Sequence, residues 1–145
     1  MNEDLAAAAI KAVTDPAFEG RKGFCSRFVR EVVASVYGDL YADLFGPSAL
    51  ATAADFNQAG LAVQASANPD PGDILFKTSG AGPFGHVGIF VGDKGVAESS
   101  STSIGRVQGA KGYRSLAQFG PFQDVGWVAR VAGRWVSRRT MPPIP

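Results

Sequence analysis

Apolar side chains recur at three- and four-residue steps through the first part of the chain, the spacing of amphipathic helices. Residues 3–14 predict a short helix with an acidic first turn, which an Asp-Pro pair ends. Residues 24–37 predict a second helix, of about 14 residues, that ends at Gly38. A third helical stretch is expected within 39–66, around SALATAADFNQAG. The apolar face of the second helix consists of Phe28, Val29, Val32, Val33, Val36 and Tyr37.

After the turn sequence NPDPGD the pattern changes to short alternating segments, which indicate strands. A helical turn is expected at 113–119, and a loose tail over 138–145. Helices therefore come first and an antiparallel sheet of about five strands second, which predicts an α+β fold in one domain, residues 1–137. The expected strands are 73–77 (DILFK), 86–91 (HVGIFV), 95–100 (GVAESS), 104–107 (IGRV) and 127–132 (WVARVA).

The composition is that of one globular domain. The 145 residues are 46% apolar and 19% charged, and 14 basic against 13 acidic side chains leave a formal net charge of +1. This balance favours neither nucleic acid nor an anionic membrane as a partner. No segment has the length of a membrane-spanning helix, and the acidic start MNEDLAAAAIKAV is unlike a secretory signal. We therefore expect a protein that is made in the cytoplasm without a signal peptide and does not insert into a membrane.

The only cysteine, Cys25, is predicted to lie in the first turn of the second helix. The helix dipole and the unpaired amide groups there favour the thiolate, which is the nucleophilic form. A lone cysteine is also a common buried apolar residue, so a catalytic role requires a base. The only histidine, His86, begins the strand 86–91. One cysteine and one histidine are too few for a Cys/His zinc site, and one cysteine cannot form an internal disulfide.

Alternation along the strand 86–91 divides its side chains between two faces. His86 shares its face with Gly88, which is expected to leave open space beside the imidazole for a substrate. The opposite face is expected to be buried and consists of Val87, Ile89 and Val91.

The register of the next hairpin decides where Glu98 lies. In one register Glu98 faces Ile89 and is buried unpaired in the core, at a cost of several kcal/mol. In the register shifted by one residue, with Gly95 in a left-handed or bulge position, Glu98 lies opposite Gly88 and diagonal to His86. The second register avoids the buried charge, and it favours a Cys–His–Glu triad.

In such a triad Glu98 holds His86 in one tautomer, while His86 keeps Cys25 as a thiolate and later protonates the leaving amine. Ser100, which would face His86 directly, is the second choice for the orienting residue. Amide groups at the helix start, that of Cys25 among them, would stabilise the oxyanion of the tetrahedral intermediate.

Five segments of the chain follow one another in the order FCSRFVREVV, TAADFNQAG, PDPGDILFK, GHVGIFVGDKGVAESSS and IGRV…GYRSL…VGWVARV. In these segments the chain resembles the NlpC-type papain-like cell-wall peptidases over about residues 5–132, and the related CHAP amidase/endopeptidase domains share the plan. The resemblance implies a helix that carries the nucleophile, packed on an antiparallel sheet that carries the histidine and a third polar residue. Cys25, His86 and Glu98 match these three positions, and the acidic third residue is more similar to the CHAP branch.

Two positions depart from the NlpC-type pattern. Many of these enzymes have Asp-Cys-Ser-Gly, whereas here Phe24 and Arg27 stand at the first and last of these positions. In that family the acidic residue helps to recognise the free amine of a stem peptide. Phe24 and Arg27, together with Gly88 and Ser100, are the substrate-binding residues that we expect.

The resemblance implies a peptidoglycan hydrolase, an endopeptidase or amidase, that cleaves an amide bond of the stem peptide and needs no metal or cofactor. Its partner would be the stem peptide, reached in the cell wall or periplasm after delivery by a phage particle or a secretion system; a virion, secretion-system or immunity protein is a further possible partner. Two alternatives stay open. One is a catalytically silent binding or structural module of the same fold, such as a phage tail component, and the other is a cysteine hydrolase of a non-wall amide.

Overall fold

A computed structural model describes residues 2–18, 25–64, 68–79, 82–99, 111–126, 128, 130–131 and 134–135. Within these ranges the chain is α+β, with three longer helices and a six-stranded antiparallel sheet of order β1-β6-β2-β3-β4-β5. The helices are α1 (Glu3–Thr14), α2 (Cys25–Tyr37), α3 (Ala49–Gln58) and the short α4 (Leu116–Phe119), with single 3-10 turns η1 (Ala42–Leu44) and η2 (Gly92–Lys94). The strands are β1 (Ala62–Gln64), β2 (Ile74–Lys77), β3 (His86–Phe90), β4 (Val96–Ser99), β5 (Lys111–Arg114) and β6 (Asp124–Gly126), with β7 (Arg130–Val131) and β8 (Arg134–Trp135) forming a separate pair.

The three predicted helices are confirmed. The first spans Glu3–Thr14, with the Asn2 side chain accepting a hydrogen bond from the amide of Leu5 at its start. The second is described over Cys25–Tyr37, and Phe24 lies outside the described residues. The third, Ala49–Gln58, begins after Ser48, whose hydroxyl accepts from the amide of Ala51.

The strands expected at 73–77, 86–91 and 95–100 are confirmed as β2, β3 and β4, whereas 104–107 lies outside the described residues. The strand expected at 127–132 is wrong as a member of the main sheet. The main-sheet strand in that region is β6, and of the residues described within 127–132, Arg130–Val131 is a strand of the separate pair. The helical turn expected at 113–119 is confirmed for Leu116–Phe119 alone, because β5 runs to Arg114. The tail 138–145 lies outside the described residues.

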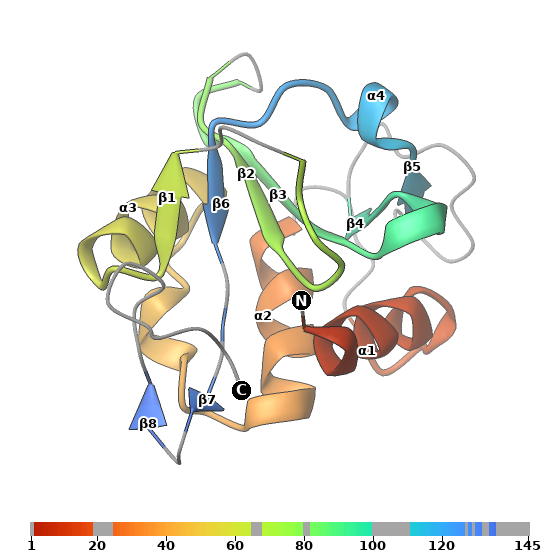
Figure 1. The fold of residues 1–145 in the computed structure, drawn as a ribbon, viewed down its shortest axis with the longest axis horizontal. Helices are drawn as coiled ribbons and strands as arrows, with labels where there is room; N and C mark the ends of the chain where they lie inside the picture. Colours follow the sequence, from red (N-terminus) through yellow and green to blue (C-terminus); the bar gives the residue numbers. More distant parts are fainter. Residues whose placement is uncertain are drawn as a thin grey trace.

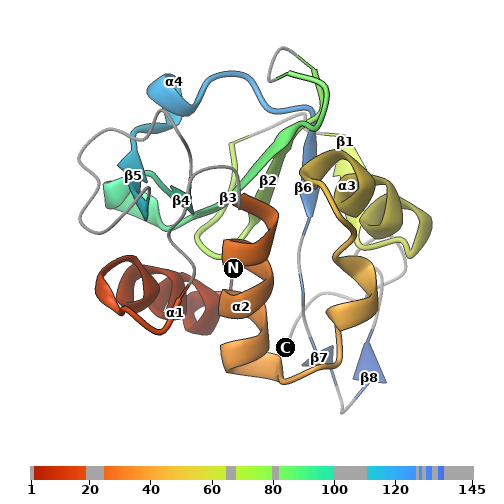
Figure 2. The ribbon, with the colours of Figure 1, turned by 180° about the vertical axis from the view of Figure 1, so that it is seen from behind.

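The two faces of the sheet are covered unequally. In Figures 1 and 2, which show opposite sides of the molecule, α2 and α3 lie on one face of the sheet, and α4 lies at the end of β5. The large core lies between these helices and the sheet, and it contains Val87, Ile89 and Val91, as the alternation of β3 predicts. A smaller cluster on the other face consists of Leu75, Val96, Phe119 and Val125.

Buried Lys111 ties β5 to the end of α1. Its ammonium donates to three backbone carbonyls, those of Ala12 at 2.8 Å, Asp15 at 2.6 Å and Phe18 at 3.2 Å. The side chain is fully buried, and the carbonyls at the end of a helix lack partners within it. Lys111 thereby holds the chain in place just before it continues towards Cys25.

Among the described residues, the helices are all too short or too polar to cross a bilayer.

Candidate active site

Cys25 is the first residue of α2, and its side chain is partly buried. The helix is held against the sheet by Phe28 and Val29, which have no exposed surface. Ser26, next to the cysteine, lies 3.1 Å from the hydroxyl of Thr52 in α3, so α2 and α3 are joined beside the thiol. Cys25 is thus helical, and the prediction that it lies in the first turn of this helix involves residues before it that lie outside the described ranges.

His86 and Glu98 form a hydrogen bond across β3 and β4, with 2.6 Å between Nε2 and Oε1. The two strands pair Ile89 with Ala97 and Phe90 with Val96, which is the register predicted to keep Glu98 out of the large core. Gly95 has the left-handed φ of 87° that this hairpin requires. The register and the contact expected from it are confirmed.

The side chain of Cys25 lies near enough to the imidazole of His86 to raise the pKa of that imidazole. Because Nε2 lies against Glu98, Nδ1 is the ring nitrogen left for the thiol. The side chain of His86 is only 12% exposed, and that of Glu98 is fully buried. The structure thus brings Cys25, His86 and Glu98 together, with His86 between the other two.

Two opposing effects set the ionisation of this pair. Burial alone would lower the pKa of His86, but hydrogen bonds and charge interactions with Cys25 and Glu98 outweigh it, and the pKa is raised above 6.5. Burial alone would raise the pKa of Glu98, but hydrogen bonds from His86 and Arg114 and their positive charges hold the pKa below 4.5. The site therefore favours a protonated imidazole beside an ionised carboxylate.

Arg114 is a member of this cluster that the sequence analysis missed. Its guanidinium donates from Nε to Oε2 of Glu98 and from Nη2 to Oε1, both at 2.5 Å. β5 pairs Gly112 with Glu98, so Arg114 lies two residues further along the neighbouring strand. The strand KGYR was not predicted, so the sequence offered no register from which this contact could be read.

Phe119 covers the imidazole from the side of α4. The two ring centroids are 5.5 Å apart with an interplanar angle of 35°, and Phe119 has no exposed surface. The ammonium of Lys77 lies 5.2 Å from the centroid of the same phenyl ring, and the guanidinium of Arg114 lies 5.6 Å from it. Phe119 thus shields the His86 side of the cluster from water.

The open space expected beside Gly88 is absent, and that expectation is wrong. A Cβ at this position would lie 2.5 Å from Cγ1 of Val96 and 3.3 Å from Cε1 of Phe119. Gly88 is buried beneath these side chains, which belong to the small cluster that the sequence pattern did not predict. A substrate group cannot occupy this place without displacing them. The glycine is needed for close packing.

The other expected substrate-binding residues have mixed outcomes. Phe24 and Ser100 lie outside the described residues. Arg27 is described and exposed on α2, and its Nε lies 3.8 Å from Oε1 of Glu31 one turn later. A pair as open as this one contributes little to stability.

Two exposed apolar side chains lie beside the site, and the sequence analysis did not single them out. Phe84, two residues before His86, is 71% exposed, and Leu50 at the start of α3 is 42% exposed. The amide of Leu50 donates to the carbonyl of Phe84 at 2.9 Å, so the two residues are adjacent. Two apolar side chains are thus exposed where the chain approaches β3.

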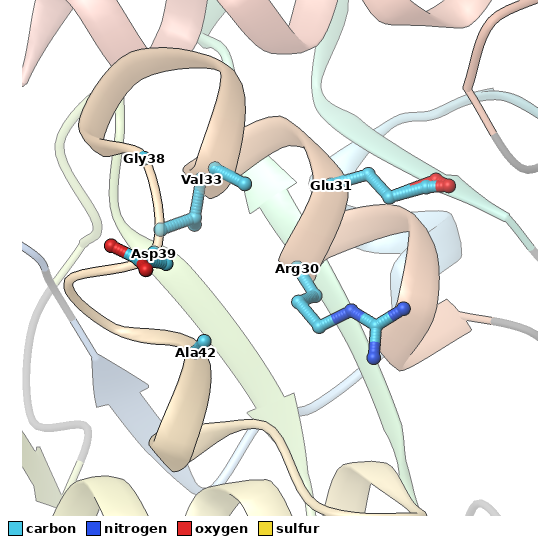
Figure 3. A pocket seen from close by; sticks show the side chains of 7 residues that line it. Arg30, Glu31, Val33, Gly38, Asp39 and Ala42 are labelled. Carbon is cyan, nitrogen blue, oxygen red and sulfur yellow. The ribbon is translucent and has the colours of Figure 1, made fainter.

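A cavity of about 270 Å³ lies elsewhere, between the second half of α2 and the turn that follows it. Figure 3 shows Arg30 and Glu31 on one side of it and Asp39 and Ala42 on the other. It shares no lining residue with the cysteine–histidine cluster. In the part of the chain that the structure describes, no three His, Cys, Asp or Glu side chains are grouped closely enough to hold a metal ion.

Neither a comparison with the models of known protein families nor one with curated protein sequences found a match to this chain.

Proposed function

We propose that this protein is a papain-like cysteine hydrolase that cleaves an amide bond in the peptide part of peptidoglycan. The observation that carries the proposal is the grouping of Cys25, His86 and Glu98, in which a thiol lies beside an imidazole that a buried carboxylate orients. This is the arrangement that nucleophilic catalysis by a thiolate requires. The wall substrate is supported by the resemblance of the five sequence segments to NlpC-type and CHAP domains.

The first half of the reaction forms an acyl-enzyme. The Sγ thiolate of Cys25 attacks the amide carbon and forms a C–S bond, while the carbonyl oxygen becomes an oxyanion. Amide groups at the start of the helix, that of Cys25 among them, would donate to that oxyanion. The C–N bond then breaks, and the imidazolium of His86 gives its proton to the leaving nitrogen.

The second half releases the acid. A water molecule loses a proton to the neutral imidazole of His86 as its oxygen attacks the thioester carbon. The C–S bond breaks, the new carboxylic acid leaves, and the thiolate–imidazolium pair is restored. Glu98 stays ionised throughout and stabilises the imidazolium through Nε2.

Digestion of purified peptidoglycan, followed by mass spectrometry of the muropeptides, tests the proposal. Wild-type protein should produce fragments that differ from undigested wall by the addition of one water at one defined amide, whereas Cys25→Ala should produce none. The variant Arg30→Met, changed on the far side of α2 beside the cavity, serves as a matched control and should cleave like wild type.

The products also name the bond, because an endopeptidase and an amidase release different fragments. Cleavage that survives Cys25→Ala would overturn the proposal. If the wall stays intact, alkylation by iodoacetamide distinguishes the alternatives. A thiol that reacts faster than a model thiol near neutral pH indicates a hydrolase of another amide, and an inert thiol indicates a silent binding module.

A further inference from the structure

The Glu98 carboxylate has two partners that compete for its oxygens. Oε1 accepts from Nε2 of His86 at 2.6 Å and from Nη2 of Arg114 at 2.5 Å, and Oε2 accepts from Nε of Arg114 at 2.5 Å. The carboxylate has no exposed surface, and the Arg114 side chain is 10% exposed. The plane of the carboxylate is thus set by the guanidinium, and the imidazole meets an oxygen whose position is already determined.

A buried carboxylate without such a partner would have two ways to fail as an orienting group. It could rotate about its terminal bond, or it could take up a proton, because burial favours the neutral acid. A planar guanidinium that binds both carboxylate oxygens prevents the rotation, and its positive charge opposes protonation of the carboxylate. A lysine at this place would supply the charge without the two-point geometry.

We propose that Arg114 is a positioning residue of the candidate active site, which holds Glu98 in the orientation that fixes the proton of His86 on Nε2 and leaves Nδ1 free to exchange a proton with Cys25. The catalytic consequence rests on the proposed hydrolase function. The positioning itself is a property of the folded protein and requires no substrate.

Several charged groups face the imidazole, from every element around it. Cys25 approaches from α2, Glu98 from β4, Arg114 from β5, and Lys77 lies opposite His86 on β2. Nη2 of Arg114 lies 3.4 Å from Nε2 of His86. Both nitrogens carry protons, so they do not hydrogen-bond each other. Each donates instead to Oε1 of Glu98. Arg114 therefore acts on the imidazole through the carboxylate.

Because the chain has a single histidine, the NMR signals of its imidazole can be assigned without ambiguity. Long-range ¹H–¹⁵N correlation of the ring above the pH at which it loses its charge reports which nitrogen keeps the proton. Wild type and Arg30→Met should show the Nε2–H tautomer alone. Arg114→Met should show both tautomers in exchange. Arg114→Lys, which keeps the charge, should fail to restore the single tautomer.

Kinetics provide the second readout. With the peptidoglycan fragment that wild type cleaves, Arg114→Met should lower kcat about 10- to 100-fold, a part of what general acid–base catalysis contributes, with KM changed less than about twofold. A residue that served folding alone would lower the fraction of active protein and leave the tautomer of the folded molecules unchanged. Active-site titration of Cys25 with iodoacetamide corrects kcat for that fraction.

A wild-type tautomer in folded Arg114→Lys or Arg114→Met would overturn the proposal. If Arg114→Met does not fold, Arg114→Lys decides on its own, since full rescue by lysine contradicts a role for the two-point contact. The two proposals fail separately. Absence of peptidoglycan cleavage by wild type overturns the hydrolase function alone, while the NMR experiment still tests the positioning by Arg114.

Discussion

Nε2 of His86 lies 2.6 Å from Oε1 of Glu98, in a pair whose histidine is only 12% exposed and whose carboxylate is fully buried. The two residues are 12 positions apart on neighbouring antiparallel strands, so a hairpin register places them together. The contact gives the imidazole a fixed partner on one nitrogen and leaves the other nitrogen as the one that can exchange a proton with the thiol.

Glu98→Gln should destabilise the fold and impair catalysis together. A carboxamide presents an NH₂ group to Arg114 or to His86, and it leaves the guanidinium without its counter-charge. Breaking a buried ion pair in this way costs about 3–5 kcal/mol. Urea unfolding near neutral pH should show that loss, and kcat should fall about 100-fold or more. Asp93→Asn on the exposed turn η2 is the control and should change neither quantity. A Glu98→Gln variant with wild-type stability would contradict the ion pair.

The pair should also make stability depend on pH in two directions. The pKa of Glu98 is lowered in the folded state, so its contribution is present above about pH 4.5 and is lost as the pH falls through the folded-state pKa. The pKa of His86 is raised, so its contribution is present below about pH 6.5 and is lost as the pH rises through the folded-state pKa. Between about pH 4.5 and pH 6.5, Glu98 and His86 therefore both make their full contribution to the free energy of unfolding.

Urea unfolding of wild type and His86→Gln from pH 4 to pH 9 measures this dependence. The difference between the two free energies of unfolding should be largest between about pH 4.5 and 6.5 and should shrink above that window. Titrating groups that do not contact His86 are shared by the two proteins, and their contributions largely cancel in the difference. A difference that grows towards pH 9 would rule out a raised pKa.

Gly88→Ala should destabilise the protein through one identifiable clash. The new Cβ would lie 2.5 Å from Cγ1 of Val96, and overpacking of this kind costs about 1–3 kcal/mol. Val96→Ala removes the clashing atom. The double variant should therefore be more stable than the sum of the two single changes predicts, by about 1 kcal/mol or more, in a thermal or urea unfolding cycle. Simple additivity would show that the space beside Gly88 is open.

Lys111→Met should loosen the end of α1. The substitution removes a charged donor from three carbonyls, those of Ala12, Asp15 and Phe18, of which the first two keep only a backbone amide as donor. A loss of about 2–3 kcal/mol is expected in urea unfolding. Hydrogen exchange should quicken first in the last turn of α1. Lys11→Met, on the exposed face of the same helix, is the control. Unchanged exchange in α1 would show that the ammonium contacts contribute nothing.

Much of the fold could be predicted because its signals are local. The helix Glu3–Thr14 and the strands β2, β3 and β4 follow from side-chain period and turn residues that are adjacent in sequence. The contact between His86 and Glu98 could also be predicted, because a hairpin has few registers and one of them buries an unpaired charge.

The short strands could not be predicted. β1 and β6 contain three residues each, too few for an alternating pattern to be distinguished from a loop. Hydrogen bonds from neighbouring strands define them, and those neighbours are far away in the chain.

The sequence by itself determined the helices, the central hairpin and the alternation that buries Val87 and Ile89, because side-chain period and turn chemistry act between near neighbours. Only the tertiary structure decided that Arg114 binds Glu98 and that Phe119 covers His86. It also decided that other side chains fill the space beside Gly88. These contacts join segments across loops whose length does not fix their path. A charged side chain finds its partner by position in space, and that position exists only after the sheet has formed.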